Sequence, residues 1–239
     1  YTPDGLARLR QAHICVIGIG GVGSWVVEAL ARSGVGELTL IDMDDICVTN
    51  INRQLPAMSG TIGKLKTEVM SERVKLINPE CTINIIDDFI SPENQSDYLN
   101  RGYDYVIDAI DNVKTKASLI AYCKRNKINV ITIGGAGGQT DPTQIQIADL
   151  SKTIQDPLLA KVRSVLRKDY NFSQNPKRKF SIDAVFSTQP LIFPQMTEGC
   201  AISATMNCAN GFGAATMITA TFGFFAVSRV IDKLLKKKS

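Results

Sequence analysis

The sequence has a single histidine, His13, and none of its six cysteines stands in a Cys-x-x-Cys pair. A structural zinc site draws its four ligands from cysteine and histidine, commonly in pairs at that spacing, so the sequence predicts no zinc. With mostly apolar neighbours and no signal peptide ahead of them, the cysteines are expected to be reduced thiols of a cytoplasmic protein. They are Cys15, Cys47, Cys81, Cys123, Cys200 and Cys208.

Linkers and internal repeats are also lacking. No stretch rich in Pro, Gly or Ser divides the 239 residues, and no segment repeats another. At this length, with 44% hydrophobic and 21% charged residues, the chain can bury one large core. We expect a single domain over residues 1–239, with a nucleotide-binding half at 1–135 and a substrate and dimer half at 136–239.

One apolar stretch resembles a membrane span. Residues from Gly211 to Val227 carry no charge, and lysines follow them. The stretch is at the lower limit of spanning length, however, and it contains several glycines and threonines. We therefore expect a helix buried against a sheet or a second subunit. Stable membrane insertion is not expected, whereas peripheral membrane association of this helix stays open.

The bases are unevenly distributed. The net charge is only +4, but residues 161–179 carry seven bases against one acid, and the segment from Arg229 onward carries five against one. A concentrated basic face suits a polyanion such as RNA, although a solvated helix face has the same composition. For the terminal segment a frayed tail is favoured. The candidate RNA-binding residues are Lys161, Arg163, Arg167, Lys168, Lys177, Arg178 and Lys179.

Strand-like runs rich in β-branched residues alternate with helical patterns. The predicted strands are Ile14–Ile17, Leu38–Ile41, Thr82–Ile86, Tyr105–Ile110 and Val130–Ile133, and the predicted helices begin at Ser24 or cover about Thr61–Ile77 and Lys114–Asn126. Such alternation predicts a Rossmann-like, doubly wound α/β fold with a mostly parallel sheet. Segments 144–147 and 180–186 are expected to pair as an antiparallel extension, with a basic helical stretch within residues 151–174 between them.

The first predicted strand runs into a glycine turn that opens a helix. Gly18, Gly20 and Gly23 have the G-x-G-x-x-G spacing, in which backbone N–H groups and the helix dipole receive a phosphate. Asp42 follows about twenty residues later, where an acid can hold ribose hydroxyls. This pattern predicts a nucleotide site and leaves the nucleotide unidentified.

A polar cluster beyond Asp42 narrows the chemistry. Asn50, Arg53 and Gln54 place a guanidinium and two amides at the phosphate end, which suits an enzyme that breaks ATP better than one that binds NAD. Because ligands bind at the carboxyl ends of strands in open α/β sheets, we expect one catalytic pocket at that edge. The other strands deliver to it Asp44, Asp108–Asn112 and Gly134–Gly138.

Four linked motifs now point to a family. They are Val16–Ser24, Ile41–Gln54, Ile62–Lys66 and Val106–Asn112. In this order they resemble the adenylation domain of the ubiquitin-activating-like superfamily, to which ThiF and MoeB belong. Segments 134–158 and 208–224 resemble one branch of it, the tRNA threonylcarbamoyladenosine dehydratases, so the resemblance extends over nearly the whole chain.

The resemblance implies an ATP site with magnesium. It assigns the phosphates to Gly18, Gly20, Gly21 and Gly23, the ribose to Asp42, the polyphosphate to Asn50, Arg53 and Gln54, the α-phosphate region to Lys66 and the magnesium ion to Asp111, with Asp44 and Asn112 completing the site. A carboxylate that attacks the α-phosphate approaches a polyanion, so the site needs fixed cations. Arg53, Lys66 and Asp111 are therefore the predicted catalytic residues.

The implied reaction is an ATP-dependent dehydration of threonylcarbamoyladenosine in tRNA. ATP adenylates the threonyl carboxylate with release of pyrophosphate, and the substrate's own carbamoyl group then displaces AMP to close a ring. Capture within one molecule is effectively unimolecular, so no enzyme nucleophile is needed. The basic segment 161–179 would hold the tRNA.

The resemblance also implies a homodimer. In such a dimer, Arg8 or Arg10 is a candidate for an arginine that completes the neighbouring subunit's site. A monovalent cation requirement stays open, as does a cysteine desulfurase or sulfur-acceptor system as a partner.

The sequence departs from the superfamily in two respects. The paired Cys-x-x-Cys zinc ligands of ThiF and MoeB relatives are absent, and the strand position expected to hold a transferring cysteine reads Asp183-Ala184, which leaves Cys200 and Cys208 nearby. An obligatory thioester is therefore not expected. The alternative function is adenylation of the C-terminus of a ubiquitin-like sulfur-carrier protein at the same ATP site.

Two further hypotheses belong to other classes. A non-catalytic nucleotide-binding scaffold is disfavoured because Arg53, Lys66 and Asp111 are all present. An NAD dehydrogenase is disfavoured because no acid–base pair for hydride transfer is visible: His13 falls in the first predicted strand, as a satisfied core or edge residue.

Overall fold

The computed structural model describes residues 1–193 and 213–236 and is built around one seven-stranded sheet, in the order β3-β2-β1-β4-β5-β7-β6. All neighbouring strands pair in parallel except β6 and β7, which are antiparallel. The predicted doubly wound fold with an antiparallel extension is confirmed. The strands are β1 His13–Ile17, β2 Glu37–Ile41, β3 Thr82–Ile86, β4 Tyr105–Asp108, β5 Val130–Ile133, β6 Ile145–Asp149 and β7 Asp183–Ser187.

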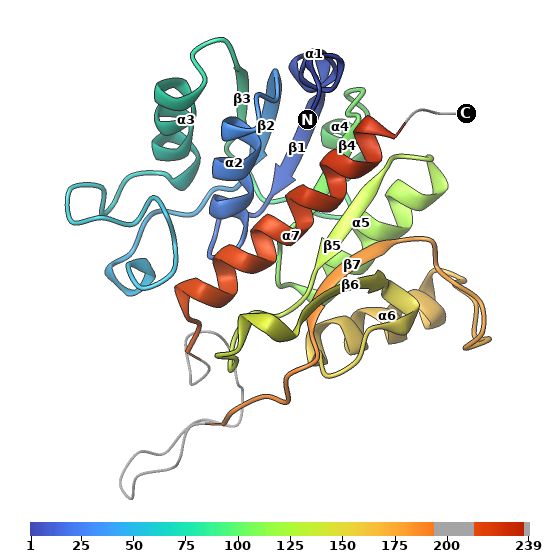
Figure 1. The fold of residues 1–239 in the computed structure, drawn as a ribbon. Helices are drawn as coiled ribbons and strands as arrows, with labels where there is room; N and C mark the ends of the chain where they lie inside the picture. The colour runs from blue at the N-terminus through green and yellow to red at the C-terminus, as the bar shows by residue number, and fades with distance from the viewer. Residues whose placement is uncertain (194–212, 237–239) are drawn as a thin grey trace, which may run out of the picture.

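Helices cover both faces of this sheet (Figure 1). One face carries α1 Pro3–Gln11, α2 Gly23–Arg32, α3 Lys66–Ile77 and α7 Thr216–Leu235, and the other carries α4 Gln95–Leu99, α5 Val113–Arg125 and α6 Pro157–Asp169. Each face therefore has its own apolar core, and the central strands are buried on both sides. This is why β1, β4 and β5 are almost continuously hydrophobic and do not alternate.

Several helices begin at a side chain that accepts a hydrogen bond from the first turn. Thr2 caps α1, Asn112 caps α5 and Asp156 caps α6, each through a side-chain oxygen. Such caps satisfy backbone N–H groups that have no partner within the helix. The caps of α5 and α6 also fix these two helix starts next to the carboxyl ends of β4 and β5.

Some predicted boundaries are wrong. The helix expected from about Thr61 begins at Lys66, because Gly63 has φ of +81° and Leu65 is extended and forms a bridge with Asp45. The strand expected to end at Ile110 ends at Asp108, and the segment expected to pair from Phe180 pairs from Asp183. Helices α1 and α4 were not expected.

Helix α7 runs diagonally across the sheet beside α2 (Figure 1). The uncharged stretch predicted to be a buried helix lies largely in it, although Gly211 is outside the described residues. Gly223 allows the close approach to α2, because a Cβ there would lie 3.1 Å from the Cβ of Trp25 and from the carbonyl oxygen of Val22. Among the residues that the structure describes, no helix is long and apolar enough to cross a membrane.

Replacing Gly223 with valine should destabilise the protein. The two methyl groups of the valine would have to displace the α2 backbone, and overpacking of this kind lowers the free energy of unfolding by about 1–3 kcal/mol. Ser228→Ala, on an exposed position of the same helix, should change the free energy of unfolding by no more than about 0.5 kcal/mol. Denaturant unfolding measures both, and equal stability of the two variants would contradict the close α2–α7 contact.

Candidate nucleotide site

Strand register brings three chain segments to one edge of the sheet. Ile17 pairs with Ile41 on one side and with Asp108 on the other, so the residues that follow these strands lie at the same level. The N–H of Gly18 donates to the carbonyl of Ile41, and the N–H of Ala109 donates to that of Ile17, both at 2.9 Å. The strand order reverses between β1 and β4, and ligands bind at such switch points.

The glycine turn between β1 and α2 requires its first and third glycines. Gly18 has φ of +85°, in the left-handed region that favours glycine. A Cβ on Gly23 would lie 1.7 Å from the carbonyl oxygen of Gly18, so the helix could not start this close to the strand. At Gly20 the nearest atom to such a Cβ is Nε2 of Gln54, at 3.8 Å, which leaves this backbone open to a ligand.

Asp42 connects the end of β2 to the glycine turn. Its Oδ2 accepts the N–H of Ile19 at 2.6 Å and its Oδ1 accepts the N–H of Asp44 at 2.8 Å. Only 7% of the residue is exposed, and this burial raises the pKa of its carboxyl group against the opposing effect of the N–H donors and of Lys66. The carboxylate is thus held in place between the glycine turn and the end of β2.

Lys66 and Asp44 form an ion pair at the same edge. The ammonium Nζ lies 2.7 Å from Oδ2 of Asp44, and the lysine side chain is only 6% exposed while the aspartate side chain is 53% exposed. The backbone N–H of Lys66 also donates to the carbonyl of Asp44, at 3.1 Å. Because Lys66 opens α3, its side chain is anchored at a helix start.

Arg53 lies over the glycine turn. If Gly21 carried a Cβ, that atom would lie 3.5 Å from Cγ of Arg53. Nη1 of Arg53 donates to the carbonyl of Thr49 at 2.8 Å and to Oδ1 of Asn52 at 2.9 Å. The Trp25 indole donates to the carbonyl of Arg53 at 3.1 Å. The guanidinium is therefore fixed by residues of its own loop, and the Trp25 hydrogen bond fixes this loop to α2.

The two predicted amides are buried beside this loop. Oδ1 of Asn50 accepts the N–H of Cys47 at 3.0 Å and so closes the turn before Arg53. Oε1 of Gln54 is buried and has no hydrogen-bond partner among the described residues. A buried amide oxygen that lacks a partner is uncommon. Because this oxygen can only accept a hydrogen bond, a hydroxyl or amino donor would satisfy it and a phosphate oxygen would not.

Asp111 and Asn112 lie in the turn between β4 and α5. Both are exposed, and the Oδ1 of Asn112 accepts the N–H of Thr115 at 3.1 Å. The Asn112 amide oxygen therefore caps α5, while Asp111 stands next to the switch point. The structure thus brings the glycine turn, Asp42, Lys66 and Asp111 to one edge.

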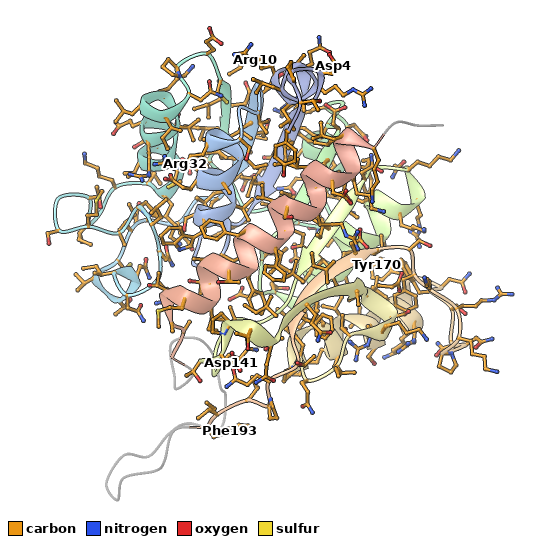
Figure 2. All side chains as sticks on the ribbon, in the orientation of Figure 1. Asp4, Arg10, Arg32, Asp141, Tyr170 and Phe193 are labelled. Atoms are coloured by element: carbon orange, nitrogen blue, oxygen red, sulfur yellow. The ribbon has the colours of Figure 1, made fainter. Side chains whose placement is uncertain are left out.

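The basic segment extends away from this edge. Helix α6 starts beside the carboxyl end of β5, where Oδ2 of Asp156 accepts the N–H of Gly135 at 3.0 Å, and its 13 residues lead about 20 Å toward the other edge. There the N–H of Phe180 donates to Asp149, the last residue of β6. In Figure 2, Asp141 before β6 and Tyr170 after α6 mark these two ends. Lys161 lies near the start of α6, at the carboxyl edge, and Lys177–Lys179 lie beyond its other end.

The predicted bases also differ in exposure. Arg163 is half-buried, contacts the hydroxyl of Thr153 and has its pKa lowered by burial and by neighbouring Arg167. Arg167 lies over the ring of Phe180, with Cζ 5.2 Å from the ring centroid. These two side chains hold α6 in place. The exposed bases are Lys161, Lys168, Lys177, Arg178 and Lys179.

Comparison with known proteins decides the family. The ThiF family model matches residues 1–239. The chain belongs to the ThiF family. It is 98% identical over 239 residues to the tRNA threonylcarbamoyladenosine dehydratase of Haemophilus influenzae, covering 100% of this chain and 92% of that protein. It is 57% identical over 245 residues to the Escherichia coli enzyme of the same name, covering 99% and 91%.

Solved structures agree with this membership. The crystal structure of E. coli tRNA N6-threonylcarbamoyladenosine dehydratase, TcdA, in complex with ATP has a TM-score of 0.90 and 55% identity, over 98% of this chain and 90% of that one. The crystal structure of the same enzyme in complex with AMP also has a TM-score of 0.90, with 56% identity and the same coverage of both chains. The predicted resemblance, to the superfamily and to this branch, is confirmed.

Sequence reasoning placed His13 correctly and missed one buried pair. Nε2 of His13 lies 2.8 Å from Oγ1 of Thr39, at the start of β1 and so at the edge opposite the nucleotide site. Lys116 in α5 is completely buried and pairs with Asp108. Its position on the apolar face that contains Ile120, one turn away, was the available signal. Cys200 and Cys208 lie outside the described residues.

Two variants distinguish the glycine that the fold of the turn requires from the glycine that leaves room for a ligand. Gly23→Ala should lower stability by about 1–3 kcal/mol, because its Cβ collides with the Gly18 carbonyl. Gly20→Ala should fold with nearly unchanged stability and bind ATP more weakly, because its Cβ occupies the approach to the phosphates. Thermal unfolding and ATP titration measure the two effects. Wild-type ATP affinity in Gly20→Ala would contradict the phosphate site.

Proposed function

We propose that this chain is an ATP-dependent tRNA threonylcarbamoyladenosine dehydratase that works by carboxylate adenylation. The observation that carries the proposal is the convergence, at the β1–β4 switch point, of a phosphate-type glycine turn with Asp42, Lys66 and Asp111. The relatives of the same name and the ATP and AMP complexes of the E. coli enzyme support it.

The first step joins the threonyl carboxylate to the α-phosphate of ATP. A carboxylate oxygen forms a bond to the α-phosphorus, the bond from that phosphorus to the β-phosphate oxygen breaks, and pyrophosphate leaves. Negative charge develops on the phosphoryl oxygens, so preorganised cations lower the barrier. We assign this role to Arg53 and Lys66; the support is that each is held at the edge by its own contacts, which it can exchange for phosphate oxygens.

The second step closes the ring. A nucleophilic atom of the carbamoyl group attacks the activated acyl carbon, the bond from that carbon to the AMP oxygen breaks, and AMP leaves with the oxygen that the carboxylate loses. The nucleophile releases its proton, so the nucleoside loses one water overall. Both groups belong to one nucleoside, and their proximity supplies most of the acceleration. The enzyme needs only to hold the substrate and exclude water.

Magnesium binding is assigned to Asp111. Magnesium is typically held by one or two carboxylates together with substrate phosphates, and an exposed carboxylate beside the glycine turn fits this requirement. The ion would neutralise charge on the phosphates. Asp111 would then act by fixing the ion relative to Gly18.

A homodimer is the proposed working form. The support from this chain is apolar side chains on the outer side of α7 and α2: Met217 is 61% exposed, and Phe224 is 45% exposed and packs edge-to-face on Trp25, with ring centroids 6.1 Å apart. A second copy that covers these side chains would remove this apolar surface from water.

The proposed reaction can be tested by mass analysis of tRNA nucleosides after incubation with the protein and ATP. The wild-type protein should convert threonylcarbamoyladenosine to a product lighter by one water, with AMP and pyrophosphate formed. Arg53→Ala and Asp111→Ala should lower turnover by about a hundredfold or more, because each removes charge stabilisation from the transition state. Their thermal stability should stay close to wild type.

Asp97→Ala and Lys124→Ala, two exposed charges away from the site, serve as controls and should leave turnover unchanged. An adenylation reaction that requires a ubiquitin-like protein, without conversion of tRNA, would replace this function with the alternative one. Normal turnover in both Arg53→Ala and Asp111→Ala would refute the proposed site.

The basic segment is proposed to bind the tRNA backbone, and its exposed bases allow a test. Replacing Lys168, Lys177 and Arg178 with glutamine should weaken tRNA binding and reduce the slope of log Kd against log salt by up to about 0.9 per lost phosphate contact. ATP affinity should not change.

The matched control removes three exposed bases elsewhere: Lys75, Lys124 and Lys127. Filter binding over a salt series measures both variants. If only the control variant loses affinity, the RNA surface lies on α3 and the end of α5, and the basic segment is a solvated surface.

A further inference from the structure

The candidate site is built on a buried ion pair that substrate does not need to contact. Lys116 and Asp108 are both 0% exposed, and Nζ of Lys116 lies 3.0 Å from Oδ1 of Asp108. Removing two charges from water is costly, and a buried pair of this kind can often be replaced by apolar residues without loss of stability. Stability alone therefore does not account for a lysine at this position.

The contacts of Lys116 are directed at one short turn. Besides the Asp108 carboxylate, its ammonium donates to the carbonyl of Ile110 at 2.8 Å and to the carbonyl of Asp108 at 3.4 Å. The Asp108 carboxylate accepts the hydroxyl of Thr132 at 2.7 Å and the N–H of Ile110 at 3.3 Å. The turn after β4 is thus tied from beneath to α5 and to β5.

The same turn is fixed on its other side by the glycine turn. The N–H of Ala109 donates to the carbonyl of Ile17, and a Cβ on Gly18 would lie only 3.1 Å from the carbonyl oxygen of Ala109. Asn112 is fixed as the cap of α5. Asp111 therefore stands between two immobilised residues, Ile110 and Asn112.

We propose that Lys116 is a positioning residue for magnesium: through the Ile110 carbonyl and the Asp108 carboxylate, it sets the direction in which Asp111 faces the nucleotide phosphates. This inference rests on the proposed function, because it assumes that Asp111 binds the ion. Residues that orient a metal ligand are known to change metal affinity by about 10- to 100-fold when they are replaced.

The test measures ATP affinity by calorimetry with and without magnesium, so it does not depend on turnover. In the wild-type protein, magnesium should tighten ATP binding. In Lys116→Met, measured below its melting temperature, the magnesium-dependent gain should fall about tenfold or more, while ATP binding without magnesium stays near the wild-type value.

Lys116→Met leaves the Asp108 carboxylate buried without its cation and can therefore lose stability. The double variant Asp108→Asn/Lys116→Met removes this unpaired charge and should regain thermal stability, but it still lacks the donor to the Ile110 carbonyl. It should therefore keep the weakened magnesium response. Recovery of the wild-type response together with the fold would overturn the proposal and leave Lys116 a structural role only.

Thr132→Val provides the matched control. It removes the hydroxyl donor to Asp108 at nearly constant volume and leaves the contact between Lys116 and Ile110 in place. Its stability should fall while its magnesium response stays normal; an equal loss of that response would show that any damage to the buried cluster suffices, which contradicts a specific role for Lys116. Absence of ATP binding in the wild-type protein would instead contradict the proposed function.

Discussion

The site depends on the register of β1 between its two parallel neighbours. Ile17 pairs with Ile41 and with Asp108, and this single alignment places the glycine turn, Asp42 and the turn after β4 at one level. A shift of one residue would turn the side chains of β1 to the opposite faces and would disrupt both cores. Burial of β1 on both faces therefore fixes the geometry of the nucleotide site as well as the fold.

The charged groups at this edge are held in different ways, in keeping with their proposed roles. Asp42 and Lys66 are buried and have specific partners, so their positions are set before a ligand arrives. Asp111 is exposed, but the residues on either side of it are fixed by hydrogen bonds. Preorganisation of this kind lets a site stabilise developing charge without rearranging during the reaction.

Much of the site could be predicted because its residues stand close to strand ends in the sequence. Gly18, Asp42 and Asp111 each follow a β-branched run, and the rule that ligands bind at carboxyl ends brings them together without any knowledge of their contacts. The start of α3 could not be predicted, because the helical pattern continues upstream of Lys66. The positive φ of Gly63 and the bridge between Asp45 and Leu65 show that this upstream segment is not helical.

The sequence by itself determined the doubly wound sheet, its antiparallel extension and the residues at its carboxyl edge, because these follow from local periodicity and turn chemistry. The tertiary structure decided which charges are available there. It paired Lys66 with Asp44, buried Lys116 against Asp108, and carried Lys177–Lys179 to the opposite edge. These contacts join residues 22, 8 and 31 positions apart, and they form only because packing in three dimensions brings the partners together, which spacing along the sequence does not encode.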